Sequence, residues 1–579
     1  MNQTYALTAV TVVVLVTVLV GALGLRISRT TSDFYVASRT VGPRLNAAAI
    51  SGEYLSAASF LGIAGLVLLQ GPAMLWYPVG YTAGYLVLLV LVAAPLRRSG
   101  AYTLPDFAED RLQSRAVRRI AVLFVLGVGW LYLLPQLQGA GLTLEILTGA
   151  PHWVGGLVVA CVVTAAVAAG GMRSITFVQA FQYWLKLTAL LVPAFFLLAA
   201  WAGDGAPRAT LDAPAAFRTH TVVTVAEDVR MSLEAPLTLT VTGTVDGRAY
   251  EDRVVTLATG RHAVRAATRL EFLPGSSVPQ TRPAAGMGVS SWSQPLSGDQ
   301  DGYRLYATYG LILATFLGTM GLPHVAVRFY TSPNGRAARR TTLVVLGLVG
   351  SFYLLPPVYG ALGRIYAPEL SLTGDADAAV LVLPERMLGG TLGDLLGALL
   401  AGGAFAAFLS TASGLTMAVA GVLHQDVLPS RARKVSTFRI AALVAMAVPL
   451  AGSLAATDVP VADAVGLAFA VSASSFCPLL VLGIWWRGLT PPGAVAGLLT
   501  GGGAALSAVL ATRTGLAPAG WVHTLLAWPA VWSVPLGFLT MVTVSLATRS
   551  RIPPGTATTL ARLHLPEDVA AHTPPGARR

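Results

Sequence analysis

The sequence predicts an all-α polytopic membrane protein with about 13 transmembrane helices and one small β-rich insert. Of its 579 residues, 54% are hydrophobic and only 11% are charged, and the mean hydropathy is +0.66. Roughly a quarter of the residues of a soluble protein are charged. Apolar segments long enough to cross a bilayer also recur along the chain. These observations exclude a water-soluble globular protein.

The predicted spans follow one another from the N-terminus. The first is predicted to be a transmembrane helix rather than a cleaved signal peptide, because no basic residue precedes it while Arg26 and Arg29 follow it. The expected spans are the segments 4–25, 46–70, 73–96, 119–148, 153–170, 175–201, 303–330, 340–364, 388–423, 436–456, 460–484, 490–512 and 524–547.

Lys and Arg residues fall in alternate loops between these spans. Cytoplasmic loops carry the excess of such residues, so the pattern predicts an N-terminus outside the cell and a C-terminus in the cytoplasm. We expect the plasma membrane as the location. The same distribution argues against nucleic-acid binding despite the net charge of +12. The basic loops hold Arg26, Arg29, Arg39 and Arg44, then Arg97, Arg98, Arg111, Arg115, Arg118 and Arg119, then Arg173, then Arg336, Arg339 and Arg340, then Arg431, Arg433 and Lys434, then Arg487, and the C-terminal tail with Arg549 and Arg551 falls on the same side.

One connection, residues 203–302, is long and polar. Its segments 221–225, 237–242 and 253–257 alternate in the manner of strands, and Asp246-Gly247 and Thr259-Gly260 are turn signals. We therefore predict a small β-rich extracellular insert. The alternative is an irregular loop.

Polar residues interrupt two apolar spans far apart in the sequence. Glu53 follows Ser51-Gly52 inside the second span, where a charge costs about 3 kcal/mol, and Ser410-Thr411 lies inside the ninth. Taken singly, a packing glycine and hydroxyls bonded to their own helix explain each segment. Taken together, they favour a small cation held by the carbonyls of a broken helix and by hydroxyls.

Several ordered motifs carry a resemblance to a known family. They are Ser32-Asp-Phe-Tyr-Val-Ala-Ser-Arg39, Glu53-Tyr-Leu-Ser-Ala-Ala-Ser-Phe-Leu-Gly62, Gly170-Gly-Met172 and Gly321-Leu-Pro-His-Val-Ala-Val-Arg-Phe329. Over residues 30–490, apart from the insert, the chain resembles the sodium:solute symporter family, most closely its cation/acetate symporter branch.

The resemblance implies a leucine-transporter-like core of two inverted repeats, formed by spans two to six and seven to eleven. The implied division of the chain is a first transmembrane helix at 1–30, two core halves at 31–202 and 303–486, the insert at 203–302, two last spans at 487–548 and a cytoplasmic tail at 549–579.

The resemblance also implies a sodium site. Its ligands are the backbone carbonyls of Gly52, Leu55 and Ala407 and the hydroxyls of Ser410 and Thr411. Relatives more often carry alanine at the first of these positions, which leaves a carbonyl ligand in place. Many relatives have an aspartate where this chain has Thr176, so a second sodium ion is left open.

The substrate pocket is less defined by the sequence. Inward-facing polar or aromatic candidates are Ser59, Trp76, Tyr77, Tyr132, Gln136 and Thr315. Glu53, His324 and Arg328 are candidates for gating or coupling. Lys186 is a basic residue well inside a span, and the sequence leaves open whether it pairs with an acid, contacts the substrate or extends to the surface.

The predicted function is sodium-coupled import of a small organic solute, with acetate or another short monocarboxylate first. Alternatives are uptake of proline, a sugar or another organic acid, with sodium or protons as coupling ion, and a solute sensor. The sequence has no Walker-type Gly-Lys-Ser/Thr loop and no recognisable nucleophile and base, so we expect no enzyme and no cofactor besides Na⁺. The expected partners are the solute, Na⁺ and the bilayer; the oligomeric state is not predicted.

Overall fold

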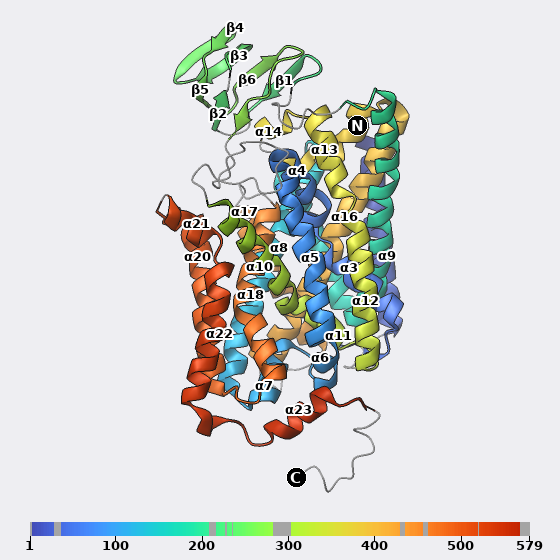
Figure 1. Cartoon of the computed structure of the whole chain (residues 1–579). Coiled ribbons are helices and arrows are strands. Elements are labelled where there is room, and N and C mark those ends of the chain that lie inside the picture. The colour runs from blue at the N-terminus through green and yellow to red at the C-terminus, as the bar shows by residue number, and fades with distance from the viewer. Residues whose placement is uncertain are drawn as a thin grey trace.

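The computed structural model describes residues 3–27, 36–207, 216–225, 228–233, 235–281, 303–373, 375–428, 435–455, 461–518 and 520–567. The helices run side by side in a tall bundle, with a small β-sheet beyond one end and α23 (Thr556–His564) at the other (Figure 1). Several predicted features lie outside the described residues: loop charges Arg29, Arg431, Arg433 and Lys434, motif residues 32–35, insert residues 208–215, 226–227, 234 and 282–302, and tail residues 568–579.

Within the described residues, ten continuous helical stretches are long and apolar enough to cross a bilayer, or eleven if the bent pair Leu305–Gly321 and Pro323–Phe329 is one span. The stretch Ala58–Ser99 covers part of one predicted span and all of the next, and His152–Gly203 covers two predicted spans completely. The membrane part is therefore all-α, as predicted, whereas the count of 13 is not confirmed.

The first half of the bundle follows the predicted order. Its α-helices are α1 (Gln3–Ile27), α3 (Pro43–Tyr54), α4 (Ile63–Gln70), α5 (Trp76–Val87), α6 (Ala93–Ser99), α7 (Leu104–Leu112), α8 (Arg115–Thr148) and α9 (His152–Gly203). Short 3₁₀ or π turns lie between them at η1 (Ala37–Arg39), η2 (Ala58–Gly62), η3 (Gly71–Leu75) and η4 (Leu88–Val92).

The second half begins after the insert. Its α-helices are α10 (Arg304–Gly321), α11 (Pro323–Phe329), α12 (Gly335–Phe352), α13 (Pro356–Tyr366), α14 (Leu370–Thr373), α15 (Ala379–Met387), α16 (Gly390–Val422), α17 (Val435–Ala455), α18 (Val461–Trp485), α19 (Pro491–Gly497), α20 (Gly503–Arg513), α21 (Trp521–Ala527), α22 (Ala530–Ala547) and α23. The 3₁₀ and π turns are η5 (Ala376–Ala378), η6 (Leu423–Val427), η8 (Leu498–Gly502) and η9 (Arg549–Arg551).

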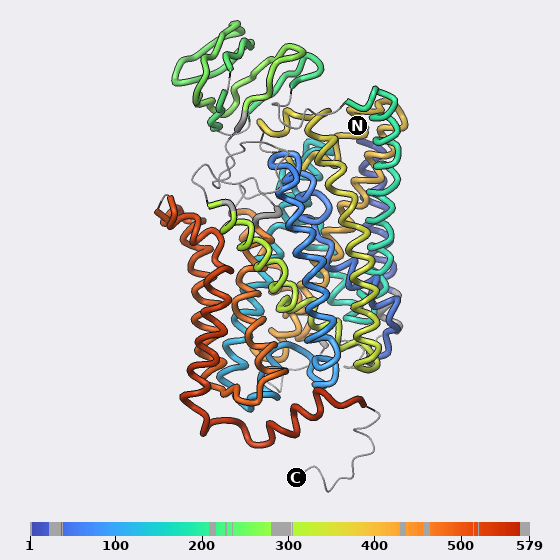
Figure 2. Tube along the Cα trace, viewed as in Figure 1, coloured from blue at the N-terminus to red at the C-terminus, as the bar shows by residue number. Residues whose placement is uncertain are grey.

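Segments from the two halves interleave in the middle of the molecule (Figure 2). α16 packs against α9, α8, α1 and α3, and α18 packs against α10 and α8. α16 is almost entirely buried, so its polar residues face other helices rather than lipid. An unpaired polar group facing hydrocarbon costs several kcal/mol, which explains this placement.

A glycine divides the long helix α9. Gly171 has φ 58° and ψ −164°, a backbone conformation that residues with a Cβ rarely adopt. The break separates the two predicted spans 153–170 and 175–201. It also sets the direction of the second part of α9, which runs beside α3 and α16.

The insert forms one antiparallel sheet. In the described residues its strands are β1 (Thr221–Thr224), β2 (Val229–Leu233), β3 (Leu237–Val245), β4 (Arg248–Leu257), β5 (Gly260–Val264), β6 (Arg269–Phe272) and β7 (Gln280–Thr281), in the order β1-β6-β3-β5-β2-β7 with β4 paired to β3. Asp246 and Gly247, both with positive φ, close the β3–β4 hairpin, as the turn signal predicted. The small β-rich insert is thus confirmed.

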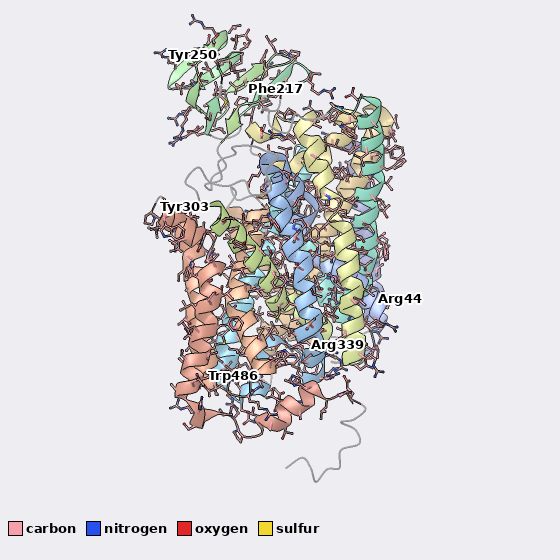
Figure 3. The ribbon with its side chains drawn as sticks, in the orientation of Figure 1. Arg44, Phe217, Tyr250, Tyr303, Arg339 and Trp486 are labelled. Carbon is pink, nitrogen blue, oxygen red and sulfur yellow. The ribbon has the colours of Figure 1, made fainter. Side chains whose placement is uncertain are left out.

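The two ends of the molecule differ in character. Helix α1 begins at the end that carries the sheet, and α23 lies at the opposite end (Figure 1). Arg44 and Arg339, from two of the predicted basic loops, lie near the end that carries α23, whereas Phe217 and Tyr303 lie toward the other end (Figure 3). Which end faces the cytoplasm stays a prediction.

Candidate functional site

Two helices of the bundle are broken at about the same depth. α3 ends at Tyr54, and Leu55 takes an extended conformation with φ −75° and ψ 90°. α10 ends at Gly321, and Leu322 is extended before α11 begins, with a bend of 44° between them. A hydrogen bond of 2.8 Å between the hydroxyls of Tyr54 and Thr319 joins α3 to α10. The breaks release backbone groups from helical bonding inside the bundle.

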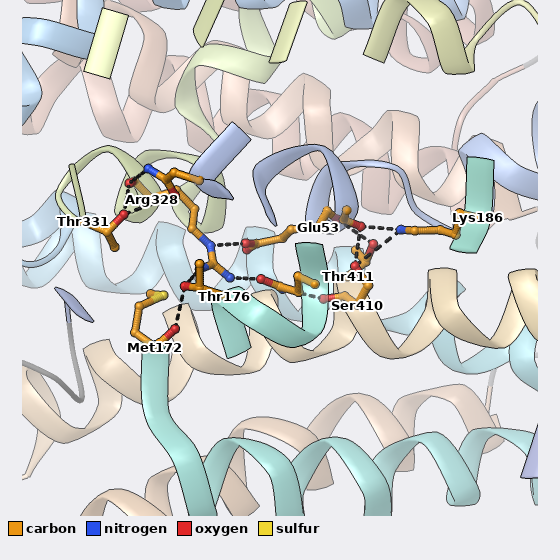
Figure 4. A network of polar contacts seen from close by, with 11 residues as sticks. Glu53, Met172, Thr176, Lys186, Arg328, Thr331, Ser410 and Thr411 are labelled. Atoms are coloured by element: carbon orange, nitrogen blue, oxygen red, sulfur yellow. Dashed lines mark hydrogen bonds and ion pairs between the residues drawn. The ribbon is translucent and has the colours of Figure 1, made fainter. Parts of the chain in front are cut away.

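The first break meets the polar pair of α16. The Ser410 hydroxyl donates to the carbonyl of Gly52, and the Thr411 hydroxyl donates to the carbonyl of Glu53 at 2.6 Å (Figure 4). Ala407, buried, lies one turn earlier on the same helix. The broken end of α3 and the Ser410-Thr411 pair of α16 therefore lie together, although they are 358 positions apart in the sequence.

A lysine ammonium lies among the same oxygens. Lys186 on α9 donates to the carbonyls of Gly52 and Leu55, the latter at 2.7 Å, and its Nζ lies 3.4 Å from the Ser410 hydroxyl (Figure 4). Its side chain is fully buried. Sequence reasoning left the role of Lys186 open; the signal was a lone charge in an apolar span, but nothing in the sequence named its partners.

An ion pair lies on the other side of Glu53. Arg328 on α11 donates through Nε to the Glu53 carboxylate at 2.5 Å, and its other nitrogens donate to Thr176 at 2.9 Å and to Gln179 (Figure 4). Gln179 in turn donates to the carbonyl of Ser410 at 2.8 Å. These contacts connect α3, α9, α11 and α16 through buried groups.

The structure explains the departure noted at Thr176. The Thr176 hydroxyl accepts from Arg328 and donates to the carbonyl of Met172 at 2.7 Å. The guanidinium group of Arg328 thus lies beside Thr176. The positive charge of Arg328 disfavours a second cation next to Thr176.

Of the substrate candidates, Ser59, Tyr132 and Gln136 lie close to the breaks. The Gln136 amide oxygen accepts from the backbone N–H of Ala57 at 3.0 Å, and the Ser59 hydroxyl lies 2.8 Å from that of Tyr353. Tyr132 packs edge-on against His324, with ring centroids 5.3 Å apart. His324 is buried, and neither of its ring nitrogens has a hydrogen-bond partner.

The other three candidates are placed differently. The Thr315 hydroxyl donates to the carbonyl of Leu311 on its own helix, as threonine hydroxyls commonly do in apolar helices. Trp76, at the start of α5, is partly exposed. Tyr77 is buried and packs against Tyr81, with ring centroids 5.9 Å apart.

A cluster of aromatic rings near the breaks was predicted only in part, through Tyr77 and Tyr132. It surrounds Tyr81 on α5, whose ring contacts rings from α3, α5 and α18 and the ring of Tyr353 at the C-cap of α12. Three of these four contacts are tilted or edge-on, as aromatic pairs favour. The only available signal was the repeated tyrosine in α5, at four-residue spacing. The contacting rings are Tyr54, Tyr77, Tyr353 and Phe469, with Tyr85 and Tyr132 against Tyr54 and Phe469.

Broken helices that expose carbonyls and polar side chains near the middle of a helical bundle are typical of secondary transporters. The model of the sodium:solute symporter family matches residues 34–245 and 289–501. The chain belongs to this family. It is accordingly a multi-pass membrane transport protein of a family that couples solutes to sodium.

Individual proteins show the same relationship. A monocarboxylic acid transporter of Corynebacterium glutamicum is 30% identical, over 89% of this chain and 87% of that protein. An uncharacterized symporter of Bacillus subtilis is 28% identical, over 93% of this chain and 93% of that protein. An uncharacterized symporter of Cupriavidus necator is 30% identical, over 90% of this chain and 88% of that protein. A substrate-bound, outward-open Na⁺-coupled sialic acid symporter shares the fold, with a TM-score of 0.61 at 12% identity, over 93% of this chain and 98% of that one.

Proposed function

We propose that the protein is a cation-coupled importer of a short monocarboxylate, such as acetate. The observation that carries the proposal is the meeting of the broken α3 with Ser410 and Thr411 around a positively charged group. A cation bound there contacts both α3 and α16, so its binding favours one arrangement of the two helices. The proposed cation site comprises Gly52, Leu55, Ala407, Ser410 and Thr411.

The substrate class rests on different support. The relative from Corynebacterium glutamicum, which this chain matches over most of its length, is named a monocarboxylic acid transporter. We place the substrate near the two breaks, against Gln136, Tyr132 and His324, whose ring nitrogens are free to bond a carboxylate. Glu53 on α3 and Arg328 on α11, joined by their ion pair, form the proposed gate. Proline, a sugar or another organic acid remain the alternatives.

Counterflow in proteoliposomes tests the substrate class without assuming a coupling ion. Vesicles loaded with unlabelled pyruvate and diluted into labelled pyruvate are expected to take up the label transiently, because exchange of one pyruvate for another needs no ion gradient. We choose pyruvate because neutral acetic acid crosses bilayers unaided. Proline, glucose and succinate in place of pyruvate are expected to give the signal of protein-free vesicles. Exchange of proline or glucose, and none of pyruvate, would remove the monocarboxylate assignment.

The coupling ion has two candidates. Membership of the family supports sodium. The contacts of Lys186 with the carbonyls of Gly52 and Leu55 favour a proton, because an ammonium already bonds the oxygens that a sodium ion would need.

We propose that the end carrying the sheet lies outside the cell and that α23 lies in the cytoplasm. Introduced cysteines test this in a Cys161→Ala background, which removes an exposed thiol. A membrane-impermeant maleimide added to intact cells is expected to label Val254→Cys on β4, where the side chain is 67% exposed. Thr558→Cys on α23 is expected to react only after lysis. The reverse pattern contradicts this orientation.

A further inference from the structure

A groove on the outer surface of the bundle shares no residue with the candidate transport site. It has a volume of about 550 Å³ and is lined by residues of α3, α9 and α12. α3 packs against both of the other helices, and the Tyr183 hydroxyl of α9 donates to the carbonyl of Leu348 on α12 at 3.1 Å. The buried Ala48 and Ala180 contribute only methyl groups to the lining, so space remains between the larger residues on either side.

Three aromatic side chains of α9 form one wall of the groove. Phe177, Phe181 and Trp184 recur at spacings of four and three residues, so they lie on one face of the helix. They are 45%, 43% and 53% exposed, within a stretch that is long and apolar enough to cross a bilayer. Apolar rings exposed on such a stretch contact lipid chains rather than water. The groove consequently opens toward the hydrocarbon of the membrane.

One end of the groove carries positive charge. Arg44, near the start of α3, is exposed and lines the groove, and it lies near the end of the molecule that carries α23 (Figure 3). On α12, the exposed Arg340 lies four and eight residues before Val344 and Leu348, so helical spacing puts all three on the face that lines the groove. In the described part of the chain no carboxylate pairs with either arginine.

An apolar wall with arginines at one end complements a molecule that has an acyl chain and an anionic headgroup. Guanidinium groups bond phosphate oxygens strongly, and each arginine near the membrane surface adds attraction for anionic lipid. A soluble anion would leave the aromatic wall unused. A second copy of the chain seated on this face would bring two sets of the same arginines together at one depth of the membrane, where like charges repel.

We propose that this groove binds one phospholipid with an anionic headgroup, from the membrane leaflet nearest α23. The phosphate of the lipid bonds Arg44 and Arg340, and one acyl chain lies along Phe177, Phe181 and Trp184. The bound lipid contacts α3, α9 and α12 at once, so its binding stabilises this arrangement of the three helices. The inference goes beyond the proposed function, since it does not depend on which solute or coupling ion the protein carries.

Lipid titrations of the delipidated full-length protein in detergent test the inference. Native mass spectrometry gives the apparent Kd of the first bound lipid for dioleoyl phosphatidylglycerol and for dioleoyl phosphatidylcholine, which has the same chains and no net charge. Phosphatidylglycerol is expected to bind about tenfold to thirtyfold more tightly and to give the higher melting temperature. Equal affinities of the two lipids overturn the inference. Binding of glycerol 3-phosphate as tight as that of phosphatidylglycerol also overturns it, because the acyl chain would then contribute nothing.

Charge variants show whether the headgroup meets the two arginines. Arg44→Gln/Arg340→Gln is expected to bind the two lipids about equally, because the affinity for phosphatidylglycerol falls to that for phosphatidylcholine. Arg115→Gln/Arg119→Gln is the matched control: it removes two exposed arginines near the start of α8, outside the groove, and is expected to keep the wild-type preference. An unchanged preference in Arg44→Gln/Arg340→Gln, or its loss in the control alone, overturns the inference.

A ring variant shows whether an acyl chain lies in the groove. Phe181→Ala is expected to weaken both lipids several-fold and to leave the ratio of their affinities unchanged. Phe195→Ala, which removes a ring of α9 outside the groove that is 70% exposed, is expected to leave both affinities unchanged. A dimer in lipid-free detergent that Phe181→Ala converts to a monomer would assign the groove to a second copy of the chain and overturn the inference. If a variant does not fold, the comparison of the two lipids on the wild-type protein decides.

Discussion

Arg328→Gln is expected to abolish uptake and to lower the free energy of unfolding by about 3–5 kcal/mol, the usual effect of removing one partner of a buried ion pair. The side chains of Arg328 and Glu53 are 1% and 2% exposed, so water cannot solvate the carboxylate left behind. Arg328 also bonds Thr176 and Gln179, and its loss frees α11 from α9. Thermal unfolding in detergent and pyruvate counterflow measure the two effects.

Two further variants separate charge from structure. In Glu53→Gln/Arg328→Gln both charges are absent, so stability is expected to recover in part while transport stays low, because the contacts to α9 are still lost. Arg218→Gln breaks an ion pair to Asp204 whose partners are 41% and 46% exposed, and such surface pairs contribute about 1 kcal/mol or less. If Arg328→Gln cost no more stability than Arg218→Gln, the ion pair would have no part in holding the gate.

Much of the fold was predictable because bilayer length and turn chemistry act locally. A run of about 20 apolar residues needs no partner to be recognised as a span. The hairpin at Asp246-Gly247 needs only the left-handed preference of its two turn residues. The count of spans was less secure, since α9 runs through the predicted loop between 170 and 175 with only the Gly171 break to separate its two parts.

The candidate site was predictable only where each segment was anomalous by itself. A charge at Glu53 and paired hydroxyls at Ser410 and Thr411 stand out in apolar helices, and the family resemblance joined them. The partner of Glu53 did not stand out, because Arg328 lies 275 positions away and any of several basic residues fitted equally well.

The position of Lys186 could not be predicted from the sequence. The resemblance implied oxygens for a cation, and of these the carbonyls of Gly52 and Leu55 and the Ser410 hydroxyl all contact one Lys186 ammonium. It did not supply the cation, because the α9 residue that reaches them lies 134 positions from Gly52 and follows no motif. The signal in the sequence was a lysine inside an apolar span with no ligand role implied by the resemblance. The structure then shows its partners.

Gly52→Ala is expected to destabilise the protein by about 1–3 kcal/mol and to slow uptake strongly. A Cβ at this position would lie 2.2 Å from the carbonyl oxygen of Gln179, a backbone atom that no side-chain rotation can move away. The helices α3 and α9 must therefore separate. That separation also draws Lys186 away from the carbonyls of Gly52 and Leu55, so stability and transport are lost together.

Gly347→Ala on α12 is the matched control, because a Cβ there meets nothing within 4 Å and alanine is the better helix former by up to about 1 kcal/mol. It is expected to leave uptake unchanged and to raise the melting temperature slightly. Equal melting temperatures and equal uptake for Gly52→Ala and Gly347→Ala would show that a methyl group fits between α3 and α9. The close approach of α3 and α9 would then have no part in placing Lys186, whose reach to the oxygens would depend on its own flexible stem.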